Sequence, residues 1–199
     1  GCLIDSKVIG VQNSIDQFFY EDNGKKYMFW GSFRGIYATE LTDNGLEIKK
    51  KTDGTPVLKK RICGNRFEGT NIYKRGEYYY LFASIGTCCN GATSTYQTVV
   101  GRSKNVLGPY LDKTGRDMLY DYCEIIMSGN ETWAGPGHNS ILIQDDVGTD
   151  WIIYHGYKKK EAENGRYVLM DKLIWSNDGW PSVKSNAPSI LEVAPYFQK

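Results

Sequence analysis

Three polar residues, Asp16, Glu68 and His138, each open a similar stretch of the sequence. Carboxyl groups can donate or accept protons as general acids and bases. A histidine ligates a cation or holds its hydration shell. Taken singly, Asp16 resembles a strand-end cap, Glu68 a surface carboxylate and His138 a core histidine. Their joint significance therefore depends on the elements that position them.

Short runs of aromatic and β-branched residues predict strands, and the sequence shows almost no helix signal. Each of the three stretches repeats one pattern of strand, Gly-containing turn, aromatic-rich strand and further strand. The central strands are expected at 27–32, 78–84 and 151–157, those before them at 17–20, 70–73 and 139–143, and those after them at 35–41, 98–103 and 167–175.

Repeats of about 40 to 50 residues with four strands each are typical of β-propeller blades. We therefore predict an all-β fold of antiparallel strands, with one partial propeller domain of about three blades over residues 1–199. In a propeller the innermost strand of each blade lines the central channel. If each unit begins on that strand, the three polar residues converge on one cavity. The blade-like units are expected near 13–60, 66–125 and 136–185.

The composition excludes several classes of protein. The 199 residues carry a formal net charge of +1, with 41% hydrophobic and 24% charged residues. That balance argues against a nucleic-acid partner and against intrinsic disorder. No apolar run approaches the roughly 20 residues of a membrane helix, and no signal-peptide pattern is present. Aromatic residues make up 14% of the chain, which suits strands and also stacking on sugar rings.

Five cysteines, an odd number, exclude complete internal pairing. No spacing typical of a zinc site occurs among them. We expect most of them to be buried as small hydrophobic residues. One disulfide from Cys88 or Cys89 to a distant partner is the alternative.

Four stretches that contain these residues resemble glycoside hydrolase family 43, most closely its endo-arabinanase branch. The matching stretches run from about Asn13 to Trp180, with gaps between them, and they occur in the family's order. They are "NSIDQFFYEDNGKKYMFWGSFRGI", "FEGTNIYKRGEYYYLFASIGTCCNGATSTY", "GPGHNSI" and "RYVLMDKLIWSNDGWPSV".

The resemblance implies a five-bladed propeller that hydrolyses glycosidic bonds in arabinan with inversion. Glu68 takes the place of the general acid, and Asp16 that of the Asp that tunes and orients the acid. An ionised Asp16 nearby would favour the protonated form of Glu68. His138 takes the place of the central histidine, beside which the arabinanase branch commonly holds a water-coordinated calcium ion.

Four further residues are candidates for binding the sugar. By resemblance, Asn13 and Ser32 line the sugar cavity, and Arg166 takes the place of a substrate-facing arginine. Trp133 offers a stacking face just upstream of "GPGHN". For each of them, ordinary strand packing or surface contact is the alternative.

One feature of the family is missing from this sequence. Its members place a first blade, with the base Asp, before the segment that contains Asp16. Asp5 is the one acidic residue upstream, and it lies too close to Asp16 to be one blade away. We therefore expect a chain without that base, with very weak or absent hydrolysis on its own. We also expect self-association through the open flanks of the partial propeller.

Two other functions stay open, besides a purely structural scaffold. The first is a xylosidase or arabinofuranosidase of the same family, although the loop "SIGTCCNGATSTY" favours the endo-arabinanase side. The second is a non-catalytic propeller fragment that binds glycans. Because polysaccharide hydrolases usually act outside the cytoplasm, we expect a periplasmic or secreted parent protein.

Overall fold

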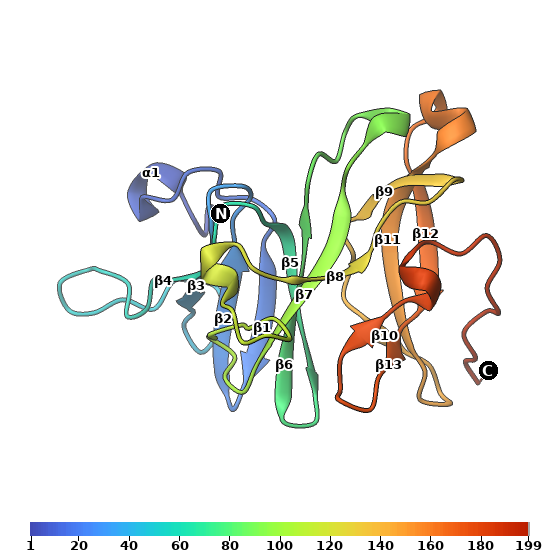
Figure 1. The fold of residues 1–199 in the computed structure, drawn as a ribbon. Helices are drawn as coiled ribbons and strands as arrows, with labels where there is room; N and C mark the ends of the chain where they lie inside the picture. Colours follow the sequence, from blue (N-terminus) through green and yellow to red (C-terminus); the bar gives the residue numbers. More distant parts are fainter. Residues whose placement is uncertain (199) are drawn as a thin grey trace. The chain divides into compact units, whose positions relative to one another are not determined.

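The computed structural model describes residues 1–198, and these are built mainly from antiparallel strands (Figure 1). The chain forms two compact units. Unit 1 comprises Gly1–Phe82 and Gly101–Cys123, and unit 2 comprises Ala83–Val100 and the chain from Glu124 onward. The expected all-β class is confirmed.

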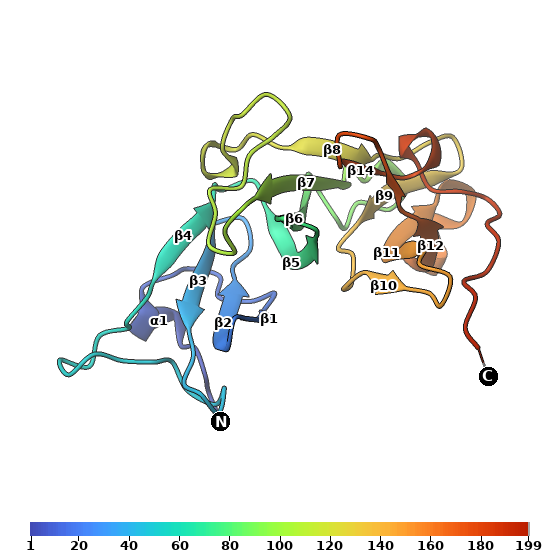
Figure 2. The ribbon, with the colours of Figure 1, turned by 90° about the horizontal axis from the view of Figure 1, so that it is seen from below.

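Unit 1 begins with a four-stranded antiparallel sheet, whose strands lie side by side in chain order (Figure 2). The turn between the first two strands is Asn23–Gly24, and both residues have positive φ, which suits a tight hairpin. Phe29, Ile36 and Ala38 are fully buried. The strands are β1 (Phe18–Asp22), β2 (Lys25–Trp30), β3 (Ile36–Glu40) and β4 (Lys60–Cys63).

The second sheet has the order β5-β6-β7-β8, and the division between the units passes through β6 and β7. Nearly every residue of β6 is buried, which explains its run of apolar and aromatic side chains without alternation. The strands are β5 (Glu68–Arg75), β6 (Tyr78–Ile85), β7 (Gln97–Ser103) and β8 (Glu124–Met127).

The sheet of unit 2 is centred on β11 (Asp150–Lys158), which pairs with β12 (Tyr167–Lys172) on one side. Its other side pairs first with β9 (Trp133–Gly137) and then with β10 (Ile143–Gln144). The strand expected at 139–143 is therefore wrong except at Ile143. The interruption begins at His138, whose φ is 50°, a left-handed conformation that a regular strand does not accommodate.

The remaining elements are short. The run expected as one strand over 167–175 divides after β12, because β13 (Ile174–Trp175) pairs with β14 (Pro181–Ser182) in a separate sheet. Within residues 1–198 no helix is long and apolar enough to cross a membrane. The helices are α1 (Ser6–Ile9) and the 3-10 turns η1 (Gly91–Thr93), η2 (Met118–Tyr120), η3 (Lys159–Asn164) and η4 (Lys184–Asn186).

An apolar anchor fixes the segment that leads into β1. Ile9, Val11 and Trp30 form a buried cluster. The Trp30 indole Nε1 donates to Ser14 Oγ at 3.1 Å, and Ser14 Oγ donates to the Val11 carbonyl at 2.8 Å. The indole is thus both buried and hydrogen-bonded, which a buried N–H requires. This anchor sets the path of the chain just before Asp16.

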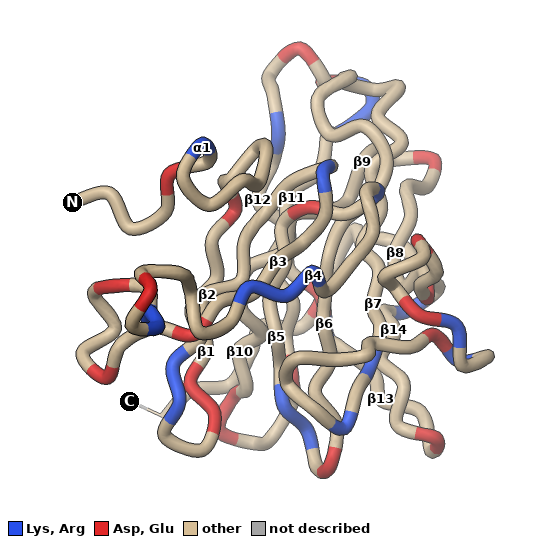
Figure 3. The backbone as a smooth tube through the Cα atoms, turned by 90° about the vertical axis from the view of Figure 1, so that its left-hand side faces the viewer, with Lys and Arg blue, Asp and Glu red and all other residues tan. Residues whose placement is uncertain are grey.

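Basic residues lie along the edge strand β4 (Figure 3). Lys59 Nζ donates to the Ile9 carbonyl at 2.6 Å, and Lys60 Nζ donates to the Leu107 carbonyl at 2.7 Å. Charged side chains on an edge strand hinder its pairing with another chain. Through their hydrogen bonds, Lys59 and Lys60 also hold the segments that contain Ile9 and Leu107 against β4.

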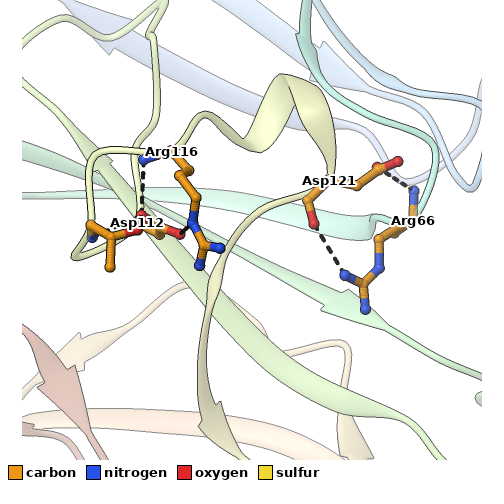
Figure 4. Close-up of polar contacts among 5 residues, drawn as sticks. Arg66, Asp112, Arg116 and Asp121 are labelled. Carbon is orange, nitrogen blue, oxygen red and sulfur yellow. Dashed lines mark hydrogen bonds and ion pairs between the residues drawn. The ribbon is translucent and has the colours of Figure 1, made fainter.

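The segment after β7 returns to unit 1 and is fastened there by two acidic residues (Figure 4). Asp112, which is buried, accepts hydrogen bonds from the Thr114 and Arg116 backbone amides, from Thr114 Oγ1 and from Arg116 Nε. Asp121 Oδ1 accepts from the Arg66 amide at 3.2 Å. Burial alone would raise the pKa of Asp112, yet these hydrogen bonds outweigh burial and hold it below its usual value.

We expect Asp112→Asn to lower the free energy of unfolding by about 2–3 kcal/mol, because the amide loses the charge and one acceptor inside a buried turn. Urea denaturation measures it, with exposed Asp43→Asn as the matched control. Because the pKa of Asp112 is lowered in the native state, its carboxylate stabilises the fold above a pH of about 4. This contribution to the free energy of unfolding is lost as the pH falls through the native pKa of Asp112. Equal stability of the two variants at pH 7 would contradict this role.

Candidate active site

Three segments of unit 1 meet at the start of β5: residues 13–16, 31–33 and 67–69. The Gly31 amide donates to the Ile15 carbonyl at 2.8 Å, and the Phe33 amide donates to the Phe67 carbonyl at 2.9 Å. The Gly31 position leaves no room for a side chain, because a β-carbon there would lie 2.2 Å from the Gly35 carbonyl oxygen. These contacts bring Asn13, Asp16, Ser32 and Glu68 together, although they are distant in sequence.

Glu68 is the first residue of β5 and is only 8% exposed. Ser32 Oγ donates to Glu68 Oε2 at 2.7 Å, and Ser32 itself is 2% exposed. A buried carboxyl group needs such partners, since burying it without hydrogen bonds is costly. Ser32 therefore orients the carboxyl group of Glu68, whereas the expected contact of Ser32 with sugar stays a prediction.

Asn13 holds the backbone of Ser32. Its Nδ2 donates to the Ser32 carbonyl at 2.8 Å, and the side chain is otherwise exposed. Asn13 thus helps to hold the backbone from which Ser32 reaches Glu68. Exposure also leaves it accessible to a ligand, as a residue that lines a sugar cavity must be.

Asp16 lies beside the backbone of Glu68. Its Oδ2 accepts a hydrogen bond from the Gly69 amide at 3.2 Å. Asp16 is partly buried and has a φ of 56°, and Gly69 has a φ of 64°. The arrangement suits a carboxylate that positions or tunes its neighbour. That role remains a prediction.

Strained backbone gathers at these segments. Asn13, Asp16 and Phe33 all have φ between 50° and 56°, a region that costs residues other than glycine roughly 1–3 kcal/mol each. Such conformations persist only where the surroundings hold them, and they are frequent at functional sites. Their concentration around Glu68 supports a functional role for this part of unit 1.

Asp5 has a structural task at the N-terminus of α1. Its Oδ1 accepts from the Lys7 amide at 2.8 Å and from the Val8 amide at 3.4 Å, which is the pattern of a helix N-cap. Asp5 thus serves as a helix cap, and the expectation that the chain lacks the general base stays a prediction.

His138 belongs to unit 2 and is exposed at the break after β9. Its backbone amide donates to Ser84 Oγ at 2.7 Å, and its Nδ1 lies 3.4 Å from the Tyr96 hydroxyl. The Tyr96 ring packs directly on the backbone of Gly137, where a β-carbon would lie 2.4 Å from the ring. The break in the strand therefore places the His138 ring beside a buried tyrosine.

His155 and Arg166 complete this cluster in unit 2. The His155 ring stacks on Tyr96 with ring centroids 5.8 Å apart and on His138 at 6.1 Å. Arg166 Nη1 lies 3.3 Å from His155 Nε2. Burial, followed by the charges of Arg166 and His138, lowers the pKa of His155 to about 4. The imidazole of His155 is therefore neutral at pH 7.

Trp133 begins β9 and is partly buried. Its ring meets Tyr167 edge to face, with centroids 5.9 Å apart. The Trp133 Nε1 is buried and has no hydrogen-bond partner among residues 1–198. Stacking of a sugar on Trp133 stays a prediction.

The surroundings of His138 determine whether a calcium ion could bind beside it. Calcium takes six to eight oxygen ligands, mainly from carboxylates, carbonyls and waters. The described part of the chain contains no group of three His, Cys, Asp or Glu side chains that suits a metal. Ser84, Tyr96 and His155 all contact His138, and none of them carries a carboxylate. These residues do not form a calcium site by themselves, and no chemical step is assigned to a metal.

Sequence reasoning missed Ser84, Tyr96 and His155, and it missed the hydrogen bond from Ser32 to Glu68. The chain has only two histidines, and both lie in one cluster. That scarcity was a usable signal, but His155 sits within an apolar strand and resembles a core residue. Whether His138 and the Glu68 segments share one cavity stays a prediction.

Antiparallel four-stranded sheets with a buried, oriented glutamate next to an aspartate are the features of a β-propeller glycosidase. The family model for glycosyl hydrolases family 43 matches residues 3–181. The chain belongs to this family, and the resemblance drawn from its motifs is confirmed.

The names of two curated relatives describe enzymes that act on arabinan-type chains. An extracellular exo-α-(1→5)-L-arabinofuranosidase of Cellvibrio japonicus is 36% identical over 182 residues, which cover 86% of this chain and 52% of the relative. An extracellular endo-α-(1→5)-L-arabinanase of Bacillus subtilis is 35% identical over 185 residues, covering 92% of this chain and 54% of the relative. The chain therefore spans about half the length of these relatives.

A solved structure shows the same fold. The α-L-arabinanase of Cellvibrio cellulosa, complexed with arabinohexaose, matches with a TM-score of 0.71 and 34% identity. The match covers 85% of this chain and 56% of that one. The expected β-propeller class is confirmed.

A double-mutant cycle of Ser32→Ala and Glu68→Gln tests the central hydrogen bond of unit 1. We expect a coupling free energy of about 1–2 kcal/mol, because the bond joins a hydroxyl to a buried carboxyl group. Urea denaturation of the four proteins measures it. Additive effects of the two substitutions would show that Ser32 does not orient Glu68.

Imidazole titration by NMR tests the cluster of unit 2. The His155 signal, assigned with His155→Gln, is expected to titrate near pH 4, far below 6.5. Arg166→Gln should raise the midpoint only partly, because burial is the larger cause. Because the native pKa is lowered, the contribution of this group to the free energy of unfolding declines as the pH falls from 6.5 towards 4. A midpoint near pH 6.5 would contradict the burial of His155 and its proximity to Arg166 and His138.

Proposed function

We propose that this chain is the part of an arabinan-degrading glycoside hydrolase that carries the general acid. Glu68 donates a proton to the leaving glycosidic oxygen, and Asp16 orients and tunes it. The observation that carries the proposal is the buried Glu68 carboxyl group, held by Ser32 and adjoining the Asp16–Gly69 hydrogen bond. Family membership supplies the reaction class, which is hydrolysis of O-glycosidic bonds.

The proposed substrate is a chain of α-1,5-linked L-arabinofuranose units. The two curated relatives named above act on that linkage, and a related arabinanase is known in complex with arabinohexaose. Similar identity to an exo-acting and to an endo-acting enzyme favours neither mode of cleavage. Asn13, Arg166 and Trp133 are the proposed contacts with sugar.

The proposed mechanism is inversion by a single displacement. Glu68 protonates the leaving oxygen while a base-activated water attacks the opposite face of the sugar, which needs the two groups about 6.5–9.5 Å apart. No residue of this chain is assigned as that base. The expectation of very weak hydrolysis by the chain alone therefore stands with the proposal, as does self-association through the flanks of its sheets.

We also propose that the protein works outside the cytoplasm. Both relatives are extracellular by name. The structure contains a disulfide between Cys88 and Cys89, and disulfides persist mainly in oxidising compartments.

The test combines binding and cleavage. We expect calorimetry to show binding of arabinohexaose in preference to xylohexaose, by the chain and by Glu68→Gln alike, because the amide keeps the shape of the acid. Any release of arabino-oligosaccharides from linear arabinan, followed by chromatography, should fall at least about 100-fold in Glu68→Gln. The matched control is Glu77→Gln, since the Glu77 side chain is 80% exposed.

Two results would overturn the proposal. Preferred binding of xylohexaose, or no binding of either sugar, would remove arabinan as the substrate. Product release that is as fast in Glu68→Gln as in Glu77→Gln would remove Glu68 as the acid.

A further inference from the structure

Unit 1 contains a pocket between the turn that joins β1 to β2 and the turn that follows β7. Its volume is about 440 Å³, and all of its lining residues belong to unit 1. This volume is within the range of sites for small molecules. We call it the distal pocket, because it lies far from Glu68.

The position of the distal pocket follows from the length of β5. Glu68 begins β5, whereas Lys74, which lies beside Asp22 in the wall of the pocket, is six residues further along the same strand. Six residues of a strand span about 20 Å. Figure 1 shows the β1–β2 and β5–β6 turns at the same edge of unit 1. A small ligand in the distal pocket therefore does not touch Glu68.

The floor of the distal pocket is apolar and fixed. Tyr27, Tyr79 and Val106 line it, and all three are buried. The Tyr79 hydroxyl donates to Asp22 Oδ1 at 2.6 Å and accepts a hydrogen bond from Lys74 Nζ at 2.9 Å. Because the floor is held in place in this way, binding requires little further ordering, which favours affinity.

Asp22 is the one carboxylate among the described residues that line the distal pocket. Its Oδ1 accepts from Tyr79 and lies 3.6 Å from Lys74 Nζ, while its Oδ2 accepts from Asn23 Nδ2 at 2.9 Å. The Asp22 side chain is 14% exposed. Since Lys74 balances its charge and both of its oxygens accept hydrogen bonds, Asp22 does little to repel an anion.

Two lysines form part of the rim, one from each turn. Lys25 begins β2 and Lys104 follows β7, and both are exposed. Lys104 Nζ lies 3.4 Å from Glu77 Oε2, but these side chains are 68% and 80% exposed. Such an exposed pair contributes little free energy. A carboxylate on a ligand can therefore replace Glu77 beside Lys104 at small cost.

Asn105 adds a hydrogen-bond donor to the same rim. Its Oδ1 accepts from the Leu107 amide at 2.9 Å, and its backbone amide donates to Ser103 Oγ at 3.0 Å. These bonds fix the turn and leave the Asn105 Nδ2 group, with its two N–H donors, for a ligand. The rim thus offers cations and donors above an apolar floor.

We propose that the distal pocket binds a sugar acid, a ring that carries a carboxylate. Lys25 and Lys104 supply the positive charge that the carboxylate meets, and Asn105 donates to the ring hydroxyls, while the C–H groups of the ring pack on the floor. The proposal goes beyond the proposed function, which concerns neutral arabinofuranose units at Glu68. Separate sites for a neutral and an acidic sugar hold the protein on a polysaccharide that contains both, since the first contact raises the effective concentration for the second.

The test is an NMR titration of the isotope-labelled chain with sodium D-galacturonate. The matched sugar is D-galactose, which carries a hydroxymethyl group in place of the carboxylate. We expect saturable shifts of the amides of residues 22–25 and 104–107 with galacturonate, and binding of galactose weaker by about 10-fold or more, because a charge-assisted hydrogen bond is lost.

The double variant Lys25→Gln, Lys104→Gln should weaken galacturonate binding by about 10-fold or more for the same reason, with an unchanged thermal midpoint. The matched control is the double variant Lys7→Gln, Lys51→Gln. It removes the same charge from two exposed lysines of unit 1 that do not line the distal pocket, and it should bind galacturonate as the unmutated chain does.

Three results would overturn the proposal: equal affinity for galactose and galacturonate, unchanged affinity in Lys25→Gln, Lys104→Gln, or no shifts at residues 22–25 and 104–107. Sodium phosphate is a further arm, and binding as tight as that of galacturonate would show a general anion site and overturn the sugar acid. Arabinohexaose binding is detected at residues 13–16, 31–33 and 67–69 instead. Failure of the distal pocket and failure of the proposed function are therefore distinguished.

Discussion

The hydrogen bond from Ser32 to the buried carboxyl group of Glu68 is the interaction on which the candidate site of unit 1 depends. A carboxyl group that is 8% exposed needs a partner fixed in place. Ser32 is fixed because Asn13 holds its carbonyl and because the neighbouring Gly31 amide bonds to Ile15. The strained backbone at Asn13 and Asp16 follows from the same requirement, since these residues must approach β5 from a chain that turns sharply before β1.

Unit 2 shows a similar use of an interrupted strand. The break at His138 lets its ring turn towards Tyr96 and stack on His155, while the amide of His138 is held by Ser84. A regular strand would have pointed alternate side chains to opposite faces instead. In both units the residue singled out by the repeat thus lies where regular pairing begins or fails. Functional side chains often occupy such positions, because the ladder does not dictate their direction.

Much of this was predictable from the sequence, and the exceptions have physical reasons. Strands such as β2, β6 and β11 were found because their aromatic and β-branched runs are flanked by turn residues. Asp16, Glu68 and His138 were singled out as candidates because they occupy matching places in a repeat. The stretch 139–143 looked like a strand by composition, and only tertiary contacts reveal that His138 interrupts it. The partner of a buried carboxyl group cannot be read from a sequence, since Ser32 and Glu68 meet through the pairing of distant segments.

The pairing of the cysteines could not be predicted from the sequence either. Neighbouring cysteines gave no indication that they pair with one another, because counting and spacing leave the connectivity open. Only the structure of the loop after β6 shows that Cys88 and Cys89 pair with one another. The expectation of a distant partner for either cysteine is wrong. The expectation that most cysteines are buried is also wrong, since Cys63 is buried while Cys2 is exposed and Cys123 is partly exposed.

An NMR titration of the isotope-labelled chain with arabinohexaose, with cellohexaose as the control sugar, tests whether Ser32 and Glu68 form part of an arabinan-binding site. We expect saturable shifts of the Asn13, Ser32 and Gly69 amides with arabinohexaose alone. In Ser32→Ala the responses of the amides at positions 32 and 69 should be lost. Absence of shifts in residues 13–16, 31–33 and 67–69, or equal shifts with cellohexaose, would contradict the claim that Ser32 and Glu68 form part of an arabinan-binding site.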